Sequence, residues 1–321
     1  MKVSAILATY NEPKWLEKVI WGYAVQTHES FELVIADDGS TAETAETIKK
    51  LRNETGLIIK HVWHEDDGFR KCRILNKAIQ AATSDYLVFS DGDCIPRNDF
   101  LEAHVRYATP RRFLSGGLVR LPMDVSHKIS VDDIQEQKAT DYAWLRGSGM
   151  SWNKKCVMLV KSKWQARLCD FLTTTRATWN GHNASGWKED ILEVNGFDER
   201  MGYGGEDREM GLRLMNKGIQ PVQIRHRAVC VHLDHKRGYV HKAILAWNKQ
   251  HRQKVSRMRM TWTNYGIAGQ EDTSSGMILQ FPGQPITPVD TDAEPAVASD
   301  SSNMVVSFPT QEEKQPTRKA A

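Results

Sequence analysis

The sequence predicts an α/β fold in which a mostly parallel sheet is flanked by helices. Residues 1–120 alternate short apolar runs with stretches whose apolar side chains recur at helical spacing. Strands that alternate with helices form parallel sheets through right-handed crossovers. Two of the apolar runs also stop abruptly at acidic residues and glycine, which is typical of strands that end at a ligand-binding edge.

The elements of this first half follow one another regularly. Pro13 suits the first turn of a helix, and Ser40 or Thr41 can cap the next helix. The run Tyr86–Ser90 is nearly all apolar, as in a strand buried on both faces, and Pro96 argues against further pairing. The predicted strands are 3–8, 31–36, 58–63 and 86–90, and the predicted helices are 14–26, about ten residues ending near 53, and 72–82.

The second half is less regular. Small polar residues mark 179–186 as a loop that crosses a site, whereas 269–321 has too little apolar surface to order itself. The expected elements are a strand at 115–121, a mainly helical stretch at 126–175, helices at 189–194 and 206–217, and an extended segment at 220–232. The chain divides into two halves of one domain, 1–120 and 121–235, then a basic helical segment, 236–268, and a disordered tail, 269–321.

Composition indicates a globular protein. The 321 residues carry a net charge of +3, with 40% hydrophobic and 26% charged residues. No apolar stretch approaches the roughly 20 residues that span a bilayer, and the first apolar run is too short for a signal peptide. The five cysteines form no CxxC pair, so we interpret them as reduced thiols and expect a cytoplasmic protein.

The charge is concentrated in the segment 235–260, which contains eight Lys or Arg residues and no acid. A helix there would have Ile244, Leu245 and Trp247 on a partly apolar side. It could lie against anionic lipid headgroups at the inner face of the cell membrane, or it could close a site from solvent. A non-enzymatic protein could also bind polyanions through this segment. Because no RNA- or DNA-binding signature accompanies it, we expect no nucleic-acid partner; the sequence leaves the oligomeric state open.

Asp91 and Asp93 follow the buried strand directly and are separated only by Gly92. Two carboxylates this close repel each other, and a divalent cation relieves the repulsion through oxygen ligands. The alternative is an ordinary turn, since Asp and Gly are common turn residues. The pattern therefore favours a cation site at the carboxyl edge of the sheet, with the turn as the competing interpretation.

Five sequence strings extend this interpretation across residues 3–235. They are TYNEP, ADDGS, HEDDGFRKCRILNKAI, YLVFSDGDCIP, and NGFDERMGYGGEDREMGLRL followed by HLDH. In this order they resemble family 2 glycosyltransferases of the GT-A fold, and the last string is similar to bacterial polysaccharide and lipopolysaccharide enzymes with a galactosyltransferase-like GGED motif. The resemblance implies inverting transfer of a sugar from a nucleotide sugar, expected to be UDP-linked, to a glycan or glycolipid hydroxyl in surface polysaccharide or lipopolysaccharide synthesis.

The resemblance also implies a metal and a nucleotide site. Asp93, with Asp91, would hold Mn²⁺ or Mg²⁺, with His235 as a distal ligand and His232 three residues before it. The alternative is a pair of surface histidines beside the basic segment. The residues implied in nucleotide-sugar binding are Tyr10 on the base, Asp38 on the uracil, Arg70 or its rival Arg73 on the diphosphate, and Asn11, Glu12, Asp91 and Gly92.

Two of these nucleotide assignments have local alternatives. Asp38 could belong to a simple turn that starts a helix, and either arginine could pair with the acids at 65–67. Ala8 also departs from the family pattern, which often has Thr at that position, so one polar contact to the nucleotide is missing. The assignments therefore depend on where the fold places these side chains.

The acceptor side of the implied site is the GGED string. Asp207 would be the general base that deprotonates the acceptor hydroxyl, and Glu206 would bind acceptor hydroxyls. Gly205 would let the backbone approach the acceptor, and Trp187 could stack on a sugar face. The alternatives are that Glu206 and Asp207 only place charge in a first helical turn, and that Trp187, like Trp152 and Trp179, is a core residue.

A sugar nucleotidyltransferase is the competing enzyme class, because it also uses paired aspartates on an α/β sheet. Such enzymes usually carry a glycine-rich phosphate loop near the first strand. Here that position reads ATYNEP, without a glycine to approach phosphate. The sequence therefore favours the glycosyltransferase.

Overall fold

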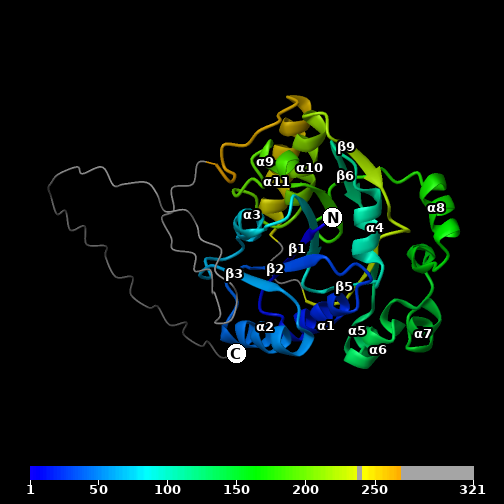
Figure 1. Ribbon diagram of the computed structural model, residues 1–321. Coiled ribbons are helices and arrows are strands. Elements are labelled where there is room, and N and C mark those ends of the chain that lie inside the picture. The colour runs from blue at the N-terminus through cyan, green and yellow to red at the C-terminus, as the bar shows by residue number, and fades with distance from the viewer. Residues whose placement is uncertain (237–240, 269–321) are drawn as a thin grey trace, which may run out of the picture. The chain divides into compact units, whose positions relative to one another are not determined.

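The computed structural model describes residues 1–236 and 241–268 and has an α/β architecture (Figure 1). Its main sheet has seven strands in the order β3-β2-β1-β4-β8-β6-β9. Neighbouring strands are parallel, except that β8 runs antiparallel to both β4 and β6. The strands are β1 Val3–Thr9, β2 Phe31–Asp37, β3 Ile59–Trp63, β4 Tyr86–Asp91, β6 Arg112–Ser115, β8 Ala184–Trp187 and β9 Gln220–Gln223. The predicted mostly parallel sheet is confirmed, and the predicted tail, 269–321, lies outside the described residues.

A second sheet of three strands has the order β5-β10-β7, with β5 at Cys94–Pro96, β7 at Gly117–Arg120 and β10 at Val229–His232. The stretches 115–121 and 220–232 were each expected to be one element, but both cross from the main sheet to this one. The expectation that pairing stops before Pro96 was wrong. Pro96 pairs with Cys230, because the chain turns after β4 and enters the second sheet.

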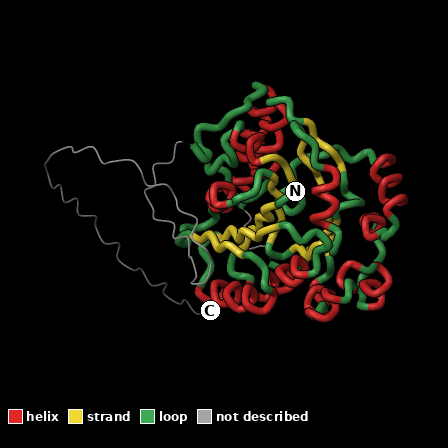
Figure 2. The backbone as a smooth tube through the Cα atoms, viewed as in Figure 1, coloured by secondary structure: helices red, strands yellow, loops and turns green. Residues whose placement is uncertain are grey.

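Helices cover both faces of the main sheet, as Figure 2 shows. The larger ones are α1 Pro13–Ala24, α2 Ala42–Thr55, α3 Lys71–Ala81, α4 Phe100–Tyr107, α8 Lys163–Leu172, α10 Glu206–Asn216 and α11 Lys242–Arg257. Shorter ones are α5 Met123–Lys128, α6 Val131–Gln135, α7 Tyr142–Gly147, α9 Lys188–Leu192 and the 3₁₀ turns η1 Lys138–Thr140 and η2 Lys154–Leu159. The bounds predicted for the helices 14–26, 72–82, 189–194 and 206–217 agree with the structure to within two residues. The helix predicted to have about ten residues is longer and ends at Thr55. In the described ranges, no helix is long and apolar enough to cross a bilayer, and all five cysteines are free.

The alternation of β1 explains the two layers. Val3, Ala5 and Leu7 enter a core with α1 and α2, whereas Ile6 and Ala8 enter a second core with α3 and α10. Both faces are therefore buried, as the continuous apolar runs require. Parallel pairing of β1, β2 and β4 then brings the carboxyl ends of all three strands to the same edge of the sheet.

Strand β8 begins inside the segment predicted as a loop, so the 179–186 expectation was partly wrong. Its residues, Ala184 to Trp187, include small ones with no apolar alternation. At the centre of a sheet, small residues leave room for large neighbours: a side chain on Gly186 would meet Trp179 at 3.2 Å. Trp179 itself is fully buried. Tertiary packing thus overrides the weak local preference for a strand.

Candidate active site

Polar residues after β1 and β2 form one rim of the carboxyl edge. Thr9 is paired with Asp37, so the two following loops are adjacent. The Asn11 amide N–H donates to the Ser40 hydroxyl at 2.8 Å, and the Asn11 side chain accepts from the Thr41 amide at 2.9 Å. Tyr10 stands out from this rim with 46% of its surface exposed, and its hydroxyl donates to Asp66. An exposed ring at this edge is available for stacking, and Glu12 lies beside it at the start of α1.

Asp38 is buried beneath this rim. One of its carboxylate oxygens lies 2.8 Å from His64 Nε2, and the other accepts from the Arg70 amide at 3.0 Å. Burial raises the pKa of the Asp38 carboxyl, although these hydrogen bonds oppose the shift. The Arg70 side chain pairs with Asp67, which is the alternative considered for it. Its rival, Arg73, is a partly buried residue of α3.

Asp93 lies against two histidines. Antiparallel pairing places His232 beside Cys94, and Asp93 Oδ2 lies 3.3 Å from His232 Nε2 and 3.0 Å from His235 Nε2. Burial alone would raise the pKa of the Asp93 carboxyl, but the bonds from both rings hold that pKa well below its usual range. One carboxylate and two imidazoles within 4.8 Å of one another are a donor set that suits Mn²⁺ or another transition metal. The residues present therefore fit the implied ion.

The second carboxylate pair opens α10. Gly204 and Gly205 both have positive φ, and a side chain on Gly204 would meet Leu245 of α11 at 2.2 Å, so this turn requires glycine. Glu206 is 8% exposed and accepts from the Gly204 amide at 2.9 Å. Burial and the neighbouring Asp207 charge raise the pKa of Glu206. Asp207 is partly exposed, and one of its oxygens accepts from the Gly181 amide at 3.0 Å.

Lys71 joins the two carboxylate groups. Its amine donates to Asp91 at 2.6 Å, and its charge interacts with both Glu206 and Asp207. Burial opposes the charged form, but these three carboxylates outweigh it and raise the pKa of Lys71. The acidic clusters at 91–93 and 206–207 therefore face a shared site although more than a hundred residues separate them. We did not predict Lys71, which lies one residue before the predicted helix 72–82.

His182 is a second residue that the sequence analysis did not identify. Burial lowers its pKa, while the charges of Asp91 and Asp207 act in the opposite direction. Its backbone carbonyl accepts from the Ser90 hydroxyl at 3.1 Å. The only hint was its place in a segment that we expected to cross a site. Gly181 and His182 do cross it, immediately before β8 begins.

The structure does not bring Trp187 to this site. It is paired with Tyr86 at the start of β4, and five residues of strand, on the order of 17 Å, separate Tyr86 from Asp91. The Trp187 ring packs edge-on against Tyr86 with centroids 5.1 Å apart, and its Nε1–H donates to the Thr109 carbonyl. The expectation that Trp187 stacks on an acceptor sugar was therefore wrong. Trp179 is a core residue too, consistent with the alternative.

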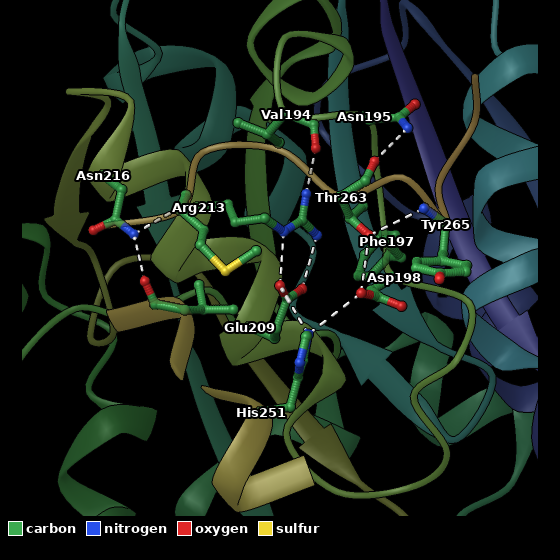
Figure 3. Close-up of polar contacts among 12 residues, drawn as sticks. Val194, Asn195, Phe197, Asp198, Glu209, Arg213, Asn216, His251, Thr263 and Tyr265 are labelled. Carbon is green, nitrogen blue, oxygen red and sulfur yellow. Dashed lines mark hydrogen bonds and ion pairs between the residues drawn. The ribbon is translucent and has the colours of Figure 1, made fainter. Parts of the chain in front are cut away.

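A buried ionic network holds α10 in place (Figure 3). Arg213 donates to both oxygens of Glu209 at 2.8 Å, and His251 Nε2 of α11 lies 3.3 Å from Asp198. Asp198, Glu209 and His251 could be read as metal ligands, but arginines already engage both carboxylates: Arg213 binds Glu209 and Arg200 binds Asp198. We interpret the network as a structural brace for the helix that carries Asp207.

Thr263 connects this network to the last described segment, and its replacement gives a first prediction. Its hydroxyl donates to Asp198 at 2.9 Å and accepts from the Tyr265 amide at 3.2 Å. We expect Thr263→Val to lower the free energy of unfolding by about 1.5–3 kcal/mol, because a hydrogen bond to a buried charge is lost without a change of shape. Urea denaturation measures this, with Thr47→Val as the matched control, because the partly exposed Thr47 hydroxyl donates to an uncharged group, the Glu43 carbonyl. Equal losses in both variants would contradict the bracing role.

The segment 235–260 mostly forms α11, which packs on α10. Ile244 and Leu245 approach Gly202 and Gly204, and the Asn248 amide donates to the carbonyl of Gly202 at 2.9 Å. The apolar side of this helix is therefore used inside the fold, over the turn that precedes Glu206. This arrangement matches the alternative in which the helix closes the site, and Trp247 of the same helix is 40% exposed.

Fold and site together define an α/β protein that gathers two carboxylate groups around a lysine at the carboxyl edge of a parallel sheet. Residues 4–146 match the family model described as "Glycosyl transferase family 2", and residues 175–236 match "N-terminal domain of galactosyltransferase". Residues 4–146 are therefore a glycosyltransferase family 2 region, which is a region of an enzyme. This finding replaces the nucleotidyltransferase and the non-enzymatic polyanion-binding protein as interpretations of the chain.

Curated relatives agree with this assignment. Validoxylamine A glucosyltransferase of Streptomyces hygroscopicus is 27% identical over 84% of this chain and 66% of its own length. Chondroitin synthase of Escherichia coli is 25% identical over 67% of this chain, which spans 32% of that relative. The chain thus spans less than two thirds of the length of these curated relatives.

Two solved structures show the same GT-A fold. Mannosyltransferase PcManGT from Pyrobaculum calidifontis, in complex with GDP-Man and Mn²⁺, has a TM-score of 0.53 with 21% identity and covers 80% of this chain and 64% of its own. S. aureus TarS 1-349, in complex with UDP-GlcNAc, has a TM-score of 0.51 with 15% identity and covers 85% and 77%. At this level of identity the likeness concerns the fold alone.

Proposed function

We propose that this protein is a metal-dependent inverting glycosyltransferase. It would move a sugar from a nucleotide sugar, UDP-linked in our proposal, to a hydroxyl of a saccharide acceptor, a glycan or glycolipid, in surface polysaccharide or lipopolysaccharide synthesis. Family membership supports sugar transfer from a nucleotide sugar. The observation that carries the proposal is the position of Lys71, which contacts Asp91 and shares a site with Glu206 and Asp207.

The donor half would lie along the ends of β1, β2 and β4. Tyr10 would pack on the base, with Asn11 and Glu12 beside it. Asp38 would accept from the base through a carboxylate already aligned by His64 and Arg70. Arg70 would have to exchange its Asp67 partner for phosphate, and Arg73 is the nearby substitute. Asp93, Asp91, His235 and His232 would hold Mn²⁺ or Mg²⁺, which when bound acts as a Lewis acid and neutralises charge on the departing nucleoside diphosphate.

The acceptor half would be the start of α10. Asp207 would take the proton from the acceptor hydroxyl, and the Gly181 amide that binds one of its oxygens fixes the orientation of the carboxylate. Glu206 and the Gly205 backbone would position the acceptor. Attack on the side of the sugar opposite the leaving group inverts the anomeric centre, so an α-linked donor gives a β-glycoside.

Thermal shift against a panel of nucleotide sugars, each with and without Mn²⁺, tests the donor assignment. The panel should contain UDP- and GDP-linked sugars, because the two structural neighbours hold one of each. We expect the melting temperature to rise most when a UDP-sugar and Mn²⁺ are both present and to rise less with Mn²⁺ alone. Stabilisation by GDP-sugars only would contradict the UDP assignment, and no stabilisation by any donor would contradict the proposed function.

Lys71 gives a prediction specific to this site. We expect Lys71→Met to lower turnover by about tenfold or more, because the site loses a positive charge that faces three carboxylates, whereas Lys71→Arg retains most activity. Release of nucleoside diphosphate measures turnover. Lys60→Met is a matched control, since Lys60 pairs with Glu32 at 3.1 Å elsewhere on the sheet. Full activity of Lys71→Met would exclude an electrostatic role.

A further inference from the structure

Helix α8 is poorly buried for a helix of a folded domain. Of its ten residues, Lys163–Leu172, only Ala166 is buried. Trp164 is 69% exposed, Phe171 84% and Leu172 65%. Together with Leu168, which is 41% exposed, these residues fall within about 100° of the helix circumference, opposite Ala166. Figure 1 shows α8 at the edge of the molecule, beyond α4. The helix therefore presents an exposed apolar stripe to solvent.

The segment around this stripe is strongly basic. Residues 151–176 contain six Lys or Arg residues and a single acid, Asp170. The Asp170 side chain is only 3% exposed and is already paired with Arg227 and His226. The exposed charge of the segment is therefore almost wholly positive. Two further exposed apolar residues, Trp152 and Val157, lie in the same stretch beside Lys154 and Lys155.

Two hollows flank α8 and differ in character. Between α4 and α8 lies a cavity of about 150 Å³ whose lining includes six cationic side chains, against the acids Asp99 and Glu102. Those cationic residues are Arg97, Arg106, Lys161, Lys163, Arg167 and Arg227. On the other flank is a mainly apolar hollow of about 500 Å³, lined by residues such as Val157, Leu159 and Leu168. Trp164 lines both.

We propose that α8 and the 151–162 segment before it form a docking surface for an anionic lipid bilayer. The apolar stripe would enter the boundary between headgroups and acyl chains, led by Trp164, Phe171 and Leu172. The surrounding lysines and arginines would contact lipid phosphates, and the basic hollow would receive a headgroup. An apolar stripe bordered by positive charge, on a helix that does not need that stripe for folding, is the combination that binds such an interface.

Charge decides in favour of a bilayer over a second copy of this chain. A second copy would bring an equally basic segment against this one, and like charges repel across an interface. An anionic membrane instead compensates the excess charge. The surface is also distinct from the basic helix α11, of which Ile244 and Leu245 pack against the turn before Glu206. Docking through α8 requires no donor, metal or acceptor, so this inference does not depend on the proposed function.

Co-sedimentation of the full chain with vesicles tests the proposal. We expect binding to vesicles of phosphatidylcholine mixed with phosphatidylglycerol, and little binding to phosphatidylcholine alone. The double variant Phe171→Glu/Leu172→Glu should lower the partition coefficient by about tenfold or more. The matched control is Leu192→Glu, which changes an exposed leucine of α9 (40% exposed) and should leave partitioning unchanged.

A second variant addresses charge without altering the stripe. Lys154→Glu/Lys155→Glu should weaken binding to the anionic vesicles to a similar degree, and added salt should weaken binding of the wild type. Circular dichroism would verify that each variant folds. Equal binding to neutral and anionic vesicles, or unchanged binding of both double variants, would overturn the proposal. If the wild type does not bind vesicles but forms a dimer, and Phe171→Glu/Leu172→Glu abolishes that dimer, the stripe would bind a second copy of the chain instead.

Discussion

Asp207→Asn should lower turnover by about 10² to 10⁴ while leaving nucleotide-sugar binding nearly unchanged. The amide keeps the size of the side chain and can still accept from the Gly181 amide, so the geometry of the helix start is retained. It cannot accept a proton from an acceptor hydroxyl. The loss should therefore appear in kcat, because the donor contacts at the ends of β1, β2 and β4 are untouched.

The control for this prediction is Asp124→Asn. Asp124 is an exposed carboxylate in the first turn of α5, so it shares with Asp207 the position at a helix start but not the site. If carboxylates in such positions served only to balance the helix dipole, both variants would lose a similar, small amount of stability and neither would lose turnover. Normal turnover of Asp207→Asn would therefore remove Asp207 as the base and support that simpler role.

The first half of the fold was predictable because its strands are long and apolar. β1, β2 and β4 are buried on both faces, so their sequences need no partner information to be recognised. β8 was not recognised, since its four small or mixed residues become a strand only between β4 and β6. The split of 115–121 into β6 and β7 also depends on a second sheet that no local pattern indicates.

The candidate site likewise contains residues that the sequence identified and residues that only the fold reveals. The resemblance named the carboxylates at 91–93 and 206–207, and packing brings them to a shared site. Lys71 and His182 could not be identified from their neighbours in sequence, because their role comes from groups at distant positions, Asp91 and Asp207. For Lys71, the one available hint is that it begins a helix directly after an acidic loop. The prediction for Trp187 was wrong for a related reason. A tryptophan suits sugar stacking, but the pairing of β8 with β4 places Trp187 beside Tyr86, at the end of β4 opposite to Asp91.

Asp93→Asn should weaken Mn²⁺ binding by more than the roughly 10–100-fold that loss of an outer-shell partner costs, since a charged ligand is removed. The amide keeps the side chain's volume between His232 and His235, so the fold of β5 and β10 should persist. Nucleoside diphosphate binding in the presence of Mn²⁺ should fall to the level of the wild type treated with a chelator. Isothermal titration with Mn²⁺ alone, and then with UDP, separates the two affinities.

Two further variants test whether the loss of Mn²⁺ affinity is specific to the cluster of Asp93, His232 and His235. His235→Ala should reduce Mn²⁺ affinity less than Asp93→Asn, because it removes a neutral ligand, whereas Asp67→Asn changes an exposed carboxylate outside the cluster and should leave affinity unchanged. Unaltered Mn²⁺ binding in Asp93→Asn would place the ion elsewhere. Lost Mn²⁺ binding with undiminished UDP binding would separate the metal from the nucleotide. We expect both affinities to be lost together only if the Asp93 carboxylate organises the ion and the diphosphate in the same place. Among the described residues, both groups of potential metal ligands at that end of β4 include Asp93.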